Sequence, residues 1–461
     1  MKTLFKNCII VARKSCTAGD GAGYEIIKDG FLGVDGAYID YVGASAPEAA
    51  YDTVKDMGGA ILMPALVNAH GHASMTLLRG AGTGLALQEW LNDAIFPVEA
   101  KLVPEDIKIG TKAAMLEMLA SGTVLFSEMY DLPYADAEVI AEAGMKANIC
   151  RAGLCFDPNF DEETDVRLRE SAEFIKVLRG EMPANDECLK EAGGISDTLL
   201  SAVKEGRILP EFCLHSEYLT TEPYARAAAR RAKALGVSVN IHVSETKKEH
   251  EECIGRHGLT PIAYLKDCGL LDSPTYAAHC VWVTDEDLEI MREKGTSFVH
   301  NPSSNLKLGS GIARVVKALS CGVNVALGTD GTASNNNLNM FEELHIAALL
   351  ATGSLHDAAA ISTEQLMDMA TINGALALGR GDTGVLAKGM KADICAVSTA
   401  APHMHPNVDT LGLLCYSAQA SDVCMSMCDG KILYENGEYK TLDKEKILFE
   451  LEKAVEDIAK R

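Results

Sequence analysis

The segment Ile61-Leu-Met-Pro-Ala-Leu-Val-Asn-Ala-His70-Gly-His72 is a strand-length apolar run that ends in two histidines. Residues two apart on a strand project to the same side, so both imidazoles can reach one ion. A His-x-His pair is weak evidence when it stands alone. We interpret His403-Met-His405, which lies between prolines, as a loop. The runs that follow support a metal-binding role for the first pair, His70 and His72.

Seven more apolar runs of strand length follow the first, and helical patterns such as residues 104–121, 222–235 and 285–294 lie between most of them. An eightfold alternation of strand and helix predicts an α/β fold, the (β/α)₈ or TIM barrel. The eight runs cover residues 61–69, 123–126, 147–152, 208–214, 237–243, 275–278, 296–299 and 323–329.

Ionisable side chains stand at the carboxyl ends of these runs, where the active site of a TIM barrel forms. They include six of the twelve histidines. The set is His70, His72, Glu128, Arg151, His215, His242, Glu245, His279, His300 and Asp330.

Alternation along two of the runs selects the metal ligands. In Val237-Ser-Val-Asn-Ile-His242 the polar side chains share one face, which points to the barrel axis, and Asp330 lies on the equivalent face of the last run. Three imidazoles and one carboxylate suit Zn²⁺, Fe²⁺ or a similar ion. We therefore predict His70, His72, His242 and Asp330 as ligands of one metal.

The two ends of the chain differ from the middle. Short strand-like stretches alternate there with tight turns at Asp29-Gly30, Asp35-Gly36 and Asp429-Gly430. This pattern predicts a small β-sandwich domain formed by residues 1–60 and 385–440, around a metal-dependent barrel over residues 61–384. Residues 441–461 are predicted to end the chain with an amphipathic helix.

Charge and cysteine content narrow the class of protein. The 461 residues carry 65 acidic and 42 basic side chains, a formal net charge of −23, which disfavours nucleic acid and anionic membranes as partners. No apolar run has signal-peptide or transmembrane length, and the 14 cysteines contain no Cys-x-x-Cys pair. We expect a cytoplasmic homo-oligomer with reduced thiols that acts on a small molecule.

The motifs resemble, in order, those of the amidohydrolase superfamily. They are His70-Gly-His72, His242-Val-Ser-Glu245, Ala278-His279-Cys280, His300-Asn-Pro-Ser-Ser-Asn305 and Gly328-Thr-Asp330-Gly331. Residues 329–342 resemble the branch of 5′-methylthioadenosine/S-adenosylhomocysteine deaminases and their chlorohydrolase relatives, and the similarity runs from about residue 3 to residue 440. Dinuclear members carry a bridging carbamylated lysine at the end of strand four, and residues 211–216 contain no lysine. This favours one divalent ion per chain, zinc first, with iron or manganese as alternatives.

The resemblance implies an aminohydrolase. Its substrate would be an adenosine derivative: 5′-methylthioadenosine, S-adenosylhomocysteine, 5′-deoxyadenosine or adenosine. Hydroxide, formed from water that the ion activates, would attack purine C6 and give the inosine analogue and ammonia. Glu245, three residues past a ligand, is placed to shuttle protons. The resemblance implies that Asp330 takes the proton of the water and that His279 orients or polarises it.

Substrate-binding residues also follow from the resemblance. Trp90 would line the pocket, Glu99 would bond the ribose hydroxyls, and Arg151 and His215 would surround the 5′ substituent. Either Arg167 or Arg169, an alternative pair, is a further candidate there. An extra stretch at residues 182–207 departs from the branch and leaves the preferred 5′ group open.

Two other functions stay open from the sequence. The first is hydrolysis of guanine, 8-oxoguanine or an s-triazine, because those relatives share the metal ligands, and the pairing of an aromatic residue with a carboxylate nine residues later favours the nucleoside. The second is a scaffold without chemistry, which would be expected to have lost ligands. The intact ligand set argues against it.

Overall fold

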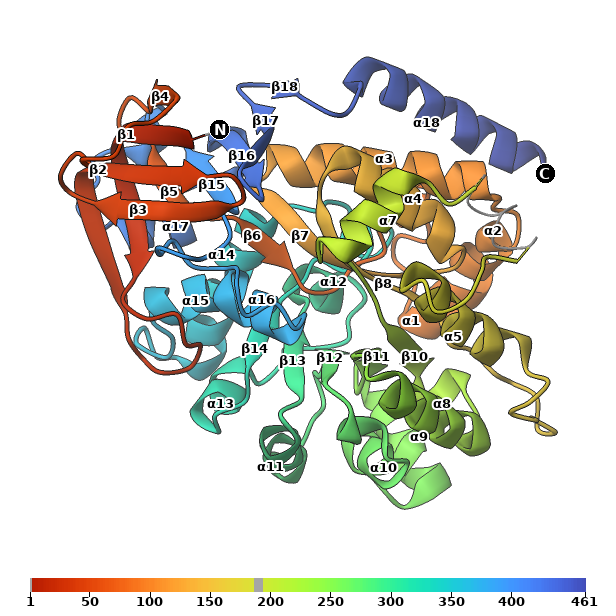
Figure 1. Cartoon of the computed structure of the whole chain (residues 1–461). Coiled ribbons are helices and arrows are strands. Elements are labelled where there is room, and N and C mark those ends of the chain that lie inside the picture. Colours follow the sequence, from red (N-terminus) through yellow and green to blue (C-terminus); the bar gives the residue numbers. More distant parts are fainter. Residues whose placement is uncertain (1, 186–193) are drawn as a thin grey trace.

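The computed structural model describes residues 2–185 and 194–461. Strands from both chain ends form one nine-stranded sheet in the order β18-β17-β16-β15-β5-β1-β2-β3, with β4 paired to β1 (Figure 1). Its strands are β1 (Lys2–Arg13), β2 (Tyr24–Asp35), β3 (Tyr38–Gly43), β4 (Thr53–Asp56), β5 (Ile61–Pro64), β15 (Ile394–Val397), β16 (Val423–Cys428), β17 (Lys431–Glu435) and β18 (Glu438–Tyr439).

The two ends share an apolar core as well as a sheet. Phe5 and Ile10 from the first strand pack in one cluster with Ile394 and Met427 from the last ones. The sheet therefore packs together side chains that are 384 (394 − 10) to 422 (427 − 5) residues apart in sequence, and it lies at one side of the molecule in Figure 1.

The predicted first strand, residues 61–69, is in fact two strands. Residues 61–64 pair with β1 and β15 in the terminal sheet, and only β6 (Leu66–Asn68) enters the barrel. The break lies at Pro64, followed by Ala65, whose N–H donates to the carbonyl of Asp393 (3.0 Å). Leu66 N then bonds Gly122 O (2.9 Å) on the barrel side. The predicted barrel boundary at residue 61 is therefore too early, while the other domain boundaries stay predictions.

The eight-stranded barrel is confirmed. All neighbouring strands are parallel, and most of their residues are buried, which explains the apolar runs. After β6 the strands are β7 (Thr123–Tyr130), β8 (Lys146–Arg151), β9 (Ile208–Pro210) with β10 (Phe212–Ser216), β11 (Val239–Val243), β12 (Thr275–His279), β13 (Ser297–His300) and β14 (Val325–Leu327).

The barrel strands form two ladders, β6 to β9 and β10 to β14, and backbone hydrogen bonds outside the ladders join them into a ring. Glu211 N donates to Ile149 O (2.9 Å), and Ala69 N donates to Leu327 O (2.9 Å), which closes the last strand onto the first. A Cβ atom on Gly328 would lie 2.9 Å from the backbone N and O of His70. Only glycine therefore lets the chain approach this closely at the seam beside the metal ligands.

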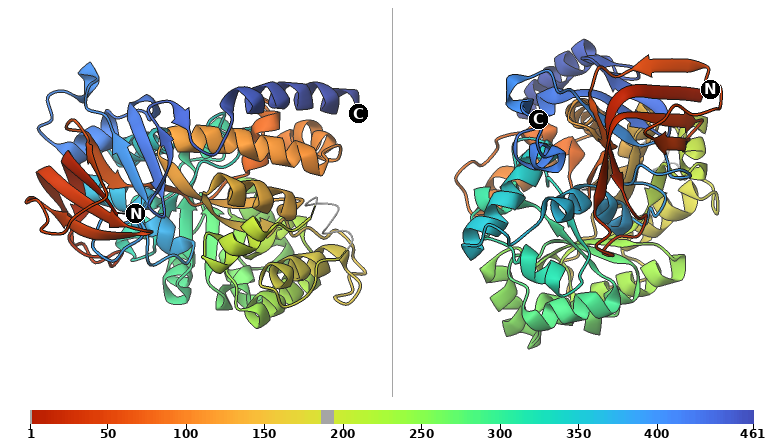
Figure 2. Two further views of the ribbon diagram at one scale, coloured as in Figure 1. Left: turned by 45° about the horizontal axis from the view of Figure 1, so that its top comes forward. Right: turned by 90° about the vertical axis from the view of Figure 1, so that its left-hand side faces the viewer.

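Helices surround the barrel, as Figures 1 and 2 show. The last of them, α18 (Lys444–Lys460), packs along α3 (Pro104–Ala120). The others are α1 (Leu87–Glu89), α2 (Phe96–Glu99), α4 (Pro133–Ala143), α5 (Val166–Leu178), α7 (Asp197–Lys204), α8 (Glu222–Leu235), α9 (Lys247–His257), α10 (Pro261–Asp267), α11 (Asp285–Lys294), α12 (Pro302–Lys307), α13 (Val315–Ser320), α14 (Met340–Leu355), α15 (Thr363–Ala370), α16 (Ile372–Ala377) and α17 (Thr410–Tyr416).

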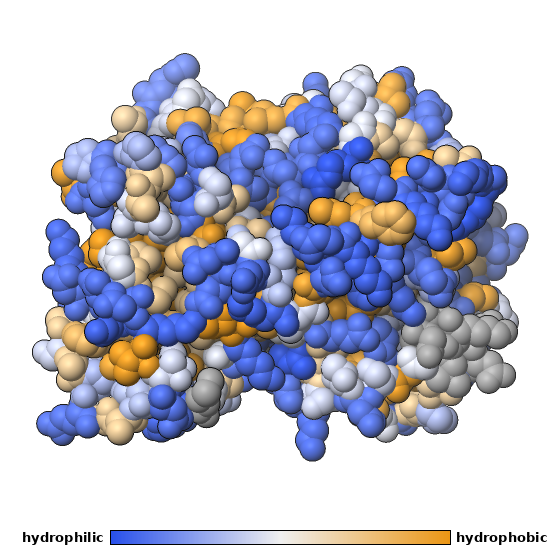
Figure 3. Space-filling model, turned by 90° about the horizontal axis from the view of Figure 1, so that it is seen from above, coloured by the Kyte–Doolittle hydropathy of each residue, from blue (hydrophilic) through white to orange (hydrophobic). Residues whose placement is uncertain are grey.

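Helix α7 lies in the stretch at 182–207 and packs on α4, while residues 186–193 of that stretch lie outside the described residues. The face in Figure 3 is largely hydrophilic with scattered apolar groups. In the described ranges, no helix combines the length and apolar character needed to cross a membrane.

Candidate active site

Four predicted ligands converge at the carboxyl ends of β6, β11 and β14. One ligand atom from each of His70, His72, His242 and Asp330 lies within 4.8 Å of the others, and all four residues are buried. Nε2 of His72 is 3.3 Å from Nε2 of His242 and 3.1 Å from Oδ1 of Asp330, and Nε2 of His70 is 3.5 Å from the same oxygen. The fold thus brings the whole predicted set together.

Backbone carbonyls fix how two of these imidazoles are protonated. Nδ1 of His72 donates to Met129 O (2.6 Å) and Nδ1 of His242 donates to His215 O (2.8 Å), because a carbonyl can only accept. Both Nε2 lone pairs therefore face each other across 3.3 Å, an arrangement that a cation between them relieves.

His70 provides an independent test of metal binding. Neither of its ring nitrogens has a hydrogen-bond partner among the described residues, although the side chain is fully buried. Unpartnered buried polar atoms are costly. Burial also lowers the pKa of His70 to about 4, which keeps the ring neutral, the form that binds a metal. The donor set fits one divalent ion.

Asp330 is oriented by two hydroxyl groups. Ser304 and Ser334 donate to its Oδ2 (2.6 and 2.8 Å), which leaves Oδ1 facing the histidines. Its φ of +63° is in the left-handed region, and its N–H donates to His70 O (3.0 Å). Burial acts to raise the pKa of Asp330, but the imidazoles of His70 and His72 beside its Oδ1 lower it by more, well below the usual range. The left-handed φ of Asp330 is a strained backbone conformation, which is typical of functional positions.

Glu245 and His279 border the ligand cluster. Nε2 of His279 lies 3.9 Å from Oε2 of Glu245 and 4.0 Å from Oδ2 of Asp330. Nδ1 of His279 donates to Oδ1 of Asn305 (2.8 Å), so its Nε2 is free to accept. Within the described part of the chain, Glu245 accepts one hydrogen bond, from Ser310 (3.2 Å), and burial raises its pKa. Its carboxyl group is therefore less saturated than that of Asp330.

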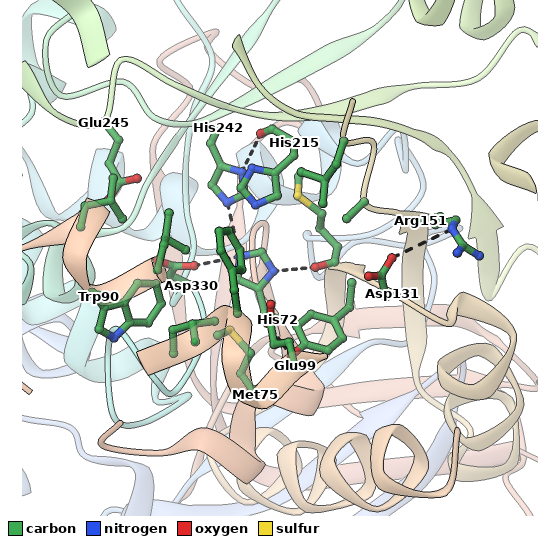
Figure 4. A pocket seen from close by; sticks show the side chains of 18 of the residues that line it. His72, Met75, Trp90, Glu99, Asp131, Arg151, His215, His242, Glu245 and Asp330 are labelled. Atoms are coloured by element: carbon green, nitrogen blue, oxygen red, sulfur yellow. Dashed lines mark hydrogen bonds and ion pairs between the residues drawn. The ribbon is translucent and has the colours of Figure 1, made fainter. Parts of the chain in front are cut away.

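A cavity of about 240 Å³ opens onto these residues (Figure 4). Trp90 lies on one side of the histidine cluster and Arg151 on the other. Trp90 begins a π-helical turn at residues 90–95, is 6% exposed, and donates from Nε1 to Ala81 O (3.0 Å). Its indole therefore has its polar group satisfied and presents an apolar surface to the cavity.

The other predicted substrate residues also line the cavity. Glu99 is half-buried and accepts a hydrogen bond from the hydroxyl of Tyr130 (2.7 Å), and burial raises its pKa. The His215 ring stacks on His242 with centroids 4.5 Å apart. Arg151 forms an ion pair with Glu170 (2.9 Å). The roles assigned to these side chains stay predictions.

Two residues at predicted strand ends do not line the cavity. Strand β7 runs to Tyr130, four residues beyond its predicted end, so Glu128 lies inside the strand and accepts a hydrogen bond from Ala73 N (2.6 Å). His300 is buried away from the cavity. Tyr130 and Asp131 stand at the actual end of the strand and line the cavity, but Ser127 and Glu128 interrupt the apolar run before them, so this run does not mark the strand end.

Further differences concern the loops. Tyr218, in the 3₁₀ turn after β10, lines the cavity, and no sequence pattern marks it. Arg167 does not line the cavity itself but forms an ion pair with Asp131 (2.7 Å), which does. Arg169 lies 3.6 Å from Glu173 on α5. Neither arginine of the alternative pair contributes to the cavity surface.

Comparisons with known proteins agree with this geometry. The sequence model of the Amidohydrolase family matches residues 61–433. The chain is 41% identical to a 5-methylthioadenosine/S-adenosylhomocysteine deaminase of Acetivibrio thermocellus, covering 100% of this chain and 99% of the relative. It is 39% identical to a 5′-deoxyadenosine deaminase of Methanosarcina mazei, covering 94% and 95%. The crystal structure of an adenosine deaminase from Xanthomonas campestris with bound zinc is similar with a TM-score of 0.87 and 29% identity, covering 100% and 99%.

Proposed function

The chain belongs to the amidohydrolase family, and from this premise we propose that it hydrolyses the 6-amino group of an adenosine derivative, giving the inosine analogue and ammonia. The observation that carries the proposal is the cluster of three histidines and Asp330 at one cavity with Glu245, Trp90 and Glu99. The relatives named as deaminases of such nucleosides, similar over nearly the whole chain, support it.

One divalent ion would be held by His70, His72, His242 and Asp330. Bound there, it acts as a Lewis acid that lowers the pKa of water toward 7 and so supplies the nucleophile at neutral pH. Zinc suits three nitrogens and one carboxylate. The protein fixes the direction of the ligands through the carbonyls of Met129 and His215.

Glu245 carries protons in the proposed reaction. As water attacks C6, one proton must reach purine N1 and another must reach the departing amine, so that the hydrogens of water end on the product ring and on ammonia. Asp330 Oδ2 already accepts two hydroxyl groups, whereas Glu245 accepts one, which leaves Glu245 freer to exchange protons. His279, about 4 Å from both carboxyl groups, orients the water through its free Nε2.

The nucleoside, rather than the free base, is supported by Glu99. An ionised carboxylate has about four acceptor positions, and Tyr130 fills one of them. Two vicinal ribose hydroxyls can donate to the rest, while the apolar indole of Trp90 contacts the ring. At the end of the cavity proposed for the 5′ group, Arg151 lies 4.0 Å from Asp131 and 2.9 Å from Glu170. Positively and negatively charged side chains therefore both lie near that group. Neutral and zwitterionic 5′ groups therefore both stay within the proposal.

An ammonia-release assay tests the proposal against the hydrolysis of other rings. The substrates are adenosine, 5′-deoxyadenosine, 5′-methylthioadenosine, S-adenosylhomocysteine, adenine, guanine, 8-oxoguanine and an s-triazine. We expect kcat/KM for the best nucleoside to exceed that for every free base at least roughly 100-fold, because a site built for hydroxyl groups rejects analogues that lack them. Comparable turnover of guanine or a triazine would favour the alternative.

We also propose a cytoplasmic location. All thirteen cysteines among the described residues are free thiols, as is usual in a reducing compartment. Homo-oligomerisation stays a prediction, as does the absence of a nucleic-acid partner, which rests on the net charge.

A further inference from the structure

The loop after β11 has a strained backbone at Ser244, directly before Glu245. Ser244 has a φ of +49°, in the left-handed region that residues with a side chain rarely adopt. Among the described residues, the side chain of Glu245 has a single hydrogen bond, from Ser310, whose carbonyl accepts from Trp282 Nε1 (2.8 Å). The position of the Glu245 carboxyl group therefore depends mainly on its backbone.

A second buried carboxylate, Glu249, supports this backbone. Its Oε1 accepts from Ser244 N and its Oε2 accepts from Glu245 N, both at 2.7 Å. Glu249 is 3% exposed and lies in the first turn of α9, where its own N–H donates to Thr246 Oγ1 (3.1 Å). The hydrogen bond that belongs to the helix cap runs from Thr246 N to Oε2 of Glu249. At 3.5 Å it is the longest of the three that this carboxylate accepts from the backbone.

The neighbouring helix α11 has a capping carboxylate, Asp287, that contacts no backbone N–H before the N-cap in the parts of the chain that the structure describes, and its Oδ1 accepts from the Thr260 hydroxyl instead. Asp287 accepts from Thr284 N (2.9 Å) and donates from its backbone to Thr284 Oγ1 (3.1 Å). Glu249 is one methylene longer and reaches two residues earlier, so its short bonds serve the loop rather than the helix end.

We propose that Glu249 is a positioning residue for Glu245. By accepting two successive backbone N–H groups it holds the strained turn at Ser244 and so directs the Glu245 carboxyl group to the cavity. The inference rests on the proposed function, because that function gives Glu245 its role as proton carrier. Glu249 itself does not line the cavity.

The test compares Glu249→Gln and Glu249→Ala with the matched control Asp287→Asn, all as metal-loaded full-length protein. Gln keeps the length of the side chain but turns an amide group toward one of the two N–H donors. We expect kcat with 5′-methylthioadenosine to fall at least tenfold in Glu249→Gln and further in Glu249→Ala. KM should stay within threefold and metal content at one equivalent, because substrate and metal contacts lie elsewhere. Asp287→Asn should lose thermal stability to a similar degree and keep its kcat.

Hydrogen exchange tests the positioning without any turnover. Peptides covering residues 243–248 should exchange at least tenfold faster in Glu249→Gln than in the wild type, and at the wild-type rate in Asp287→Asn. Unchanged exchange there in both Glu249 variants would overturn the proposal, as would faster exchange with an unchanged kcat.

A double mutant separates this proposal from the proposed function. If Glu249 acts through Glu245, then Glu245→Gln in the Glu249→Gln background should cost less than it costs alone. Losses that multiply would overturn the proposal. If Glu245→Gln alone stays fully active, the proposed function loses its proton carrier, while hydrogen exchange still decides whether Glu249 holds the loop.

Discussion

Removing the carboxylate of Glu99 should abolish the preference for a ribose. Glu99 faces the cavity, and its hydrogen bond from the described residues comes from the Tyr130 hydroxyl (2.7 Å to Oε1). Oε2 of Glu99 and the second acceptor position of Oε1 are therefore left for the substrate. The 2′- and 3′-hydroxyls of a nucleoside are adjacent and can donate together to such a carboxylate.

The size of the effect follows from these two bonds. A hydrogen bond to a charged group is worth about 1.5–3 kcal/mol, and each 1.36 kcal/mol is a factor of ten. Loss of one hydroxyl, in 2′-deoxyadenosine, should lower kcat/KM by roughly 10- to 100-fold in the wild type. Loss of both bonds, in Glu99→Ala acting on adenosine, should lower it by roughly 10²- to 10⁴-fold.

The assay is a cycle of two proteins and two substrates. Ammonia release from adenosine and 2′-deoxyadenosine is measured for the wild type and for Glu99→Ala, and the 2′-hydroxyl should matter only in the wild type. Glu89→Gln, an exposed acid of α1 on the same segment, is the control and should behave as the wild type. The clamp would be refuted if 2′-deoxyadenosine reacts as well as adenosine in the wild type, or if the same preference persists in Glu99→Ala.

Three further predictions concern proton transfer, the metal and pH. Glu245→Gln should keep its metal and lose at least roughly 10³-fold in rate; turnover within tenfold of the wild type would contradict the proton-carrier role. Elemental analysis should find about one equivalent of zinc, iron or manganese, lost in the His70→Ala/His72→Ala double mutant; two equivalents would contradict a single site. Burial raises the pKa of Glu211 from 4.5 to about 7, so the folded protein holds this proton more tightly than the unfolded chain. Its stabilising contribution is complete below pH 4.5 and is lost as pH rises through 7. Between pH 5 and pH 8 the wild type should therefore lose about 2.5 kcal/mol more unfolding free energy than Glu211→Gln, measured by urea denaturation; equal slopes would contradict it.

Much of the barrel and its ligand set could be predicted because both obey local rules. Parallel barrel strands are buried on both faces, so they stand out as apolar runs, and side chains at their carboxyl ends meet at one face. Alternation along β11 placed His242 on the inner face, and the His70-Gly-His72 spacing placed two imidazoles on one side of the chain. These relations hold within a few residues of sequence.

Strand boundaries were less accessible, because partners distant in sequence decide them. Nothing local shows that residues 61–64 pair with β15, more than 300 residues away, whereas Leu66 turns to β7. The predicted end of β7 at residue 126 was four residues early for the same reason, since pairing with β8 extends it to Tyr130. Glu128 was consequently placed at the cavity instead of within the strand.

The sequence by itself determined which atoms can hold a metal and which carboxyl groups stand near it, since residue type and spacing carry that information. Only the tertiary structure decided how those groups are held. The hydroxyls of Ser304 and Ser334 saturate one oxygen of Asp330. The carbonyl of His215 orients His242, and Glu249 accepts a hydrogen bond from the backbone of Glu245. Hydrogen bonds need donor and acceptor within about 3 Å, and most of these pairs belong to different loops or strands. Their distances therefore exist only once the barrel has closed.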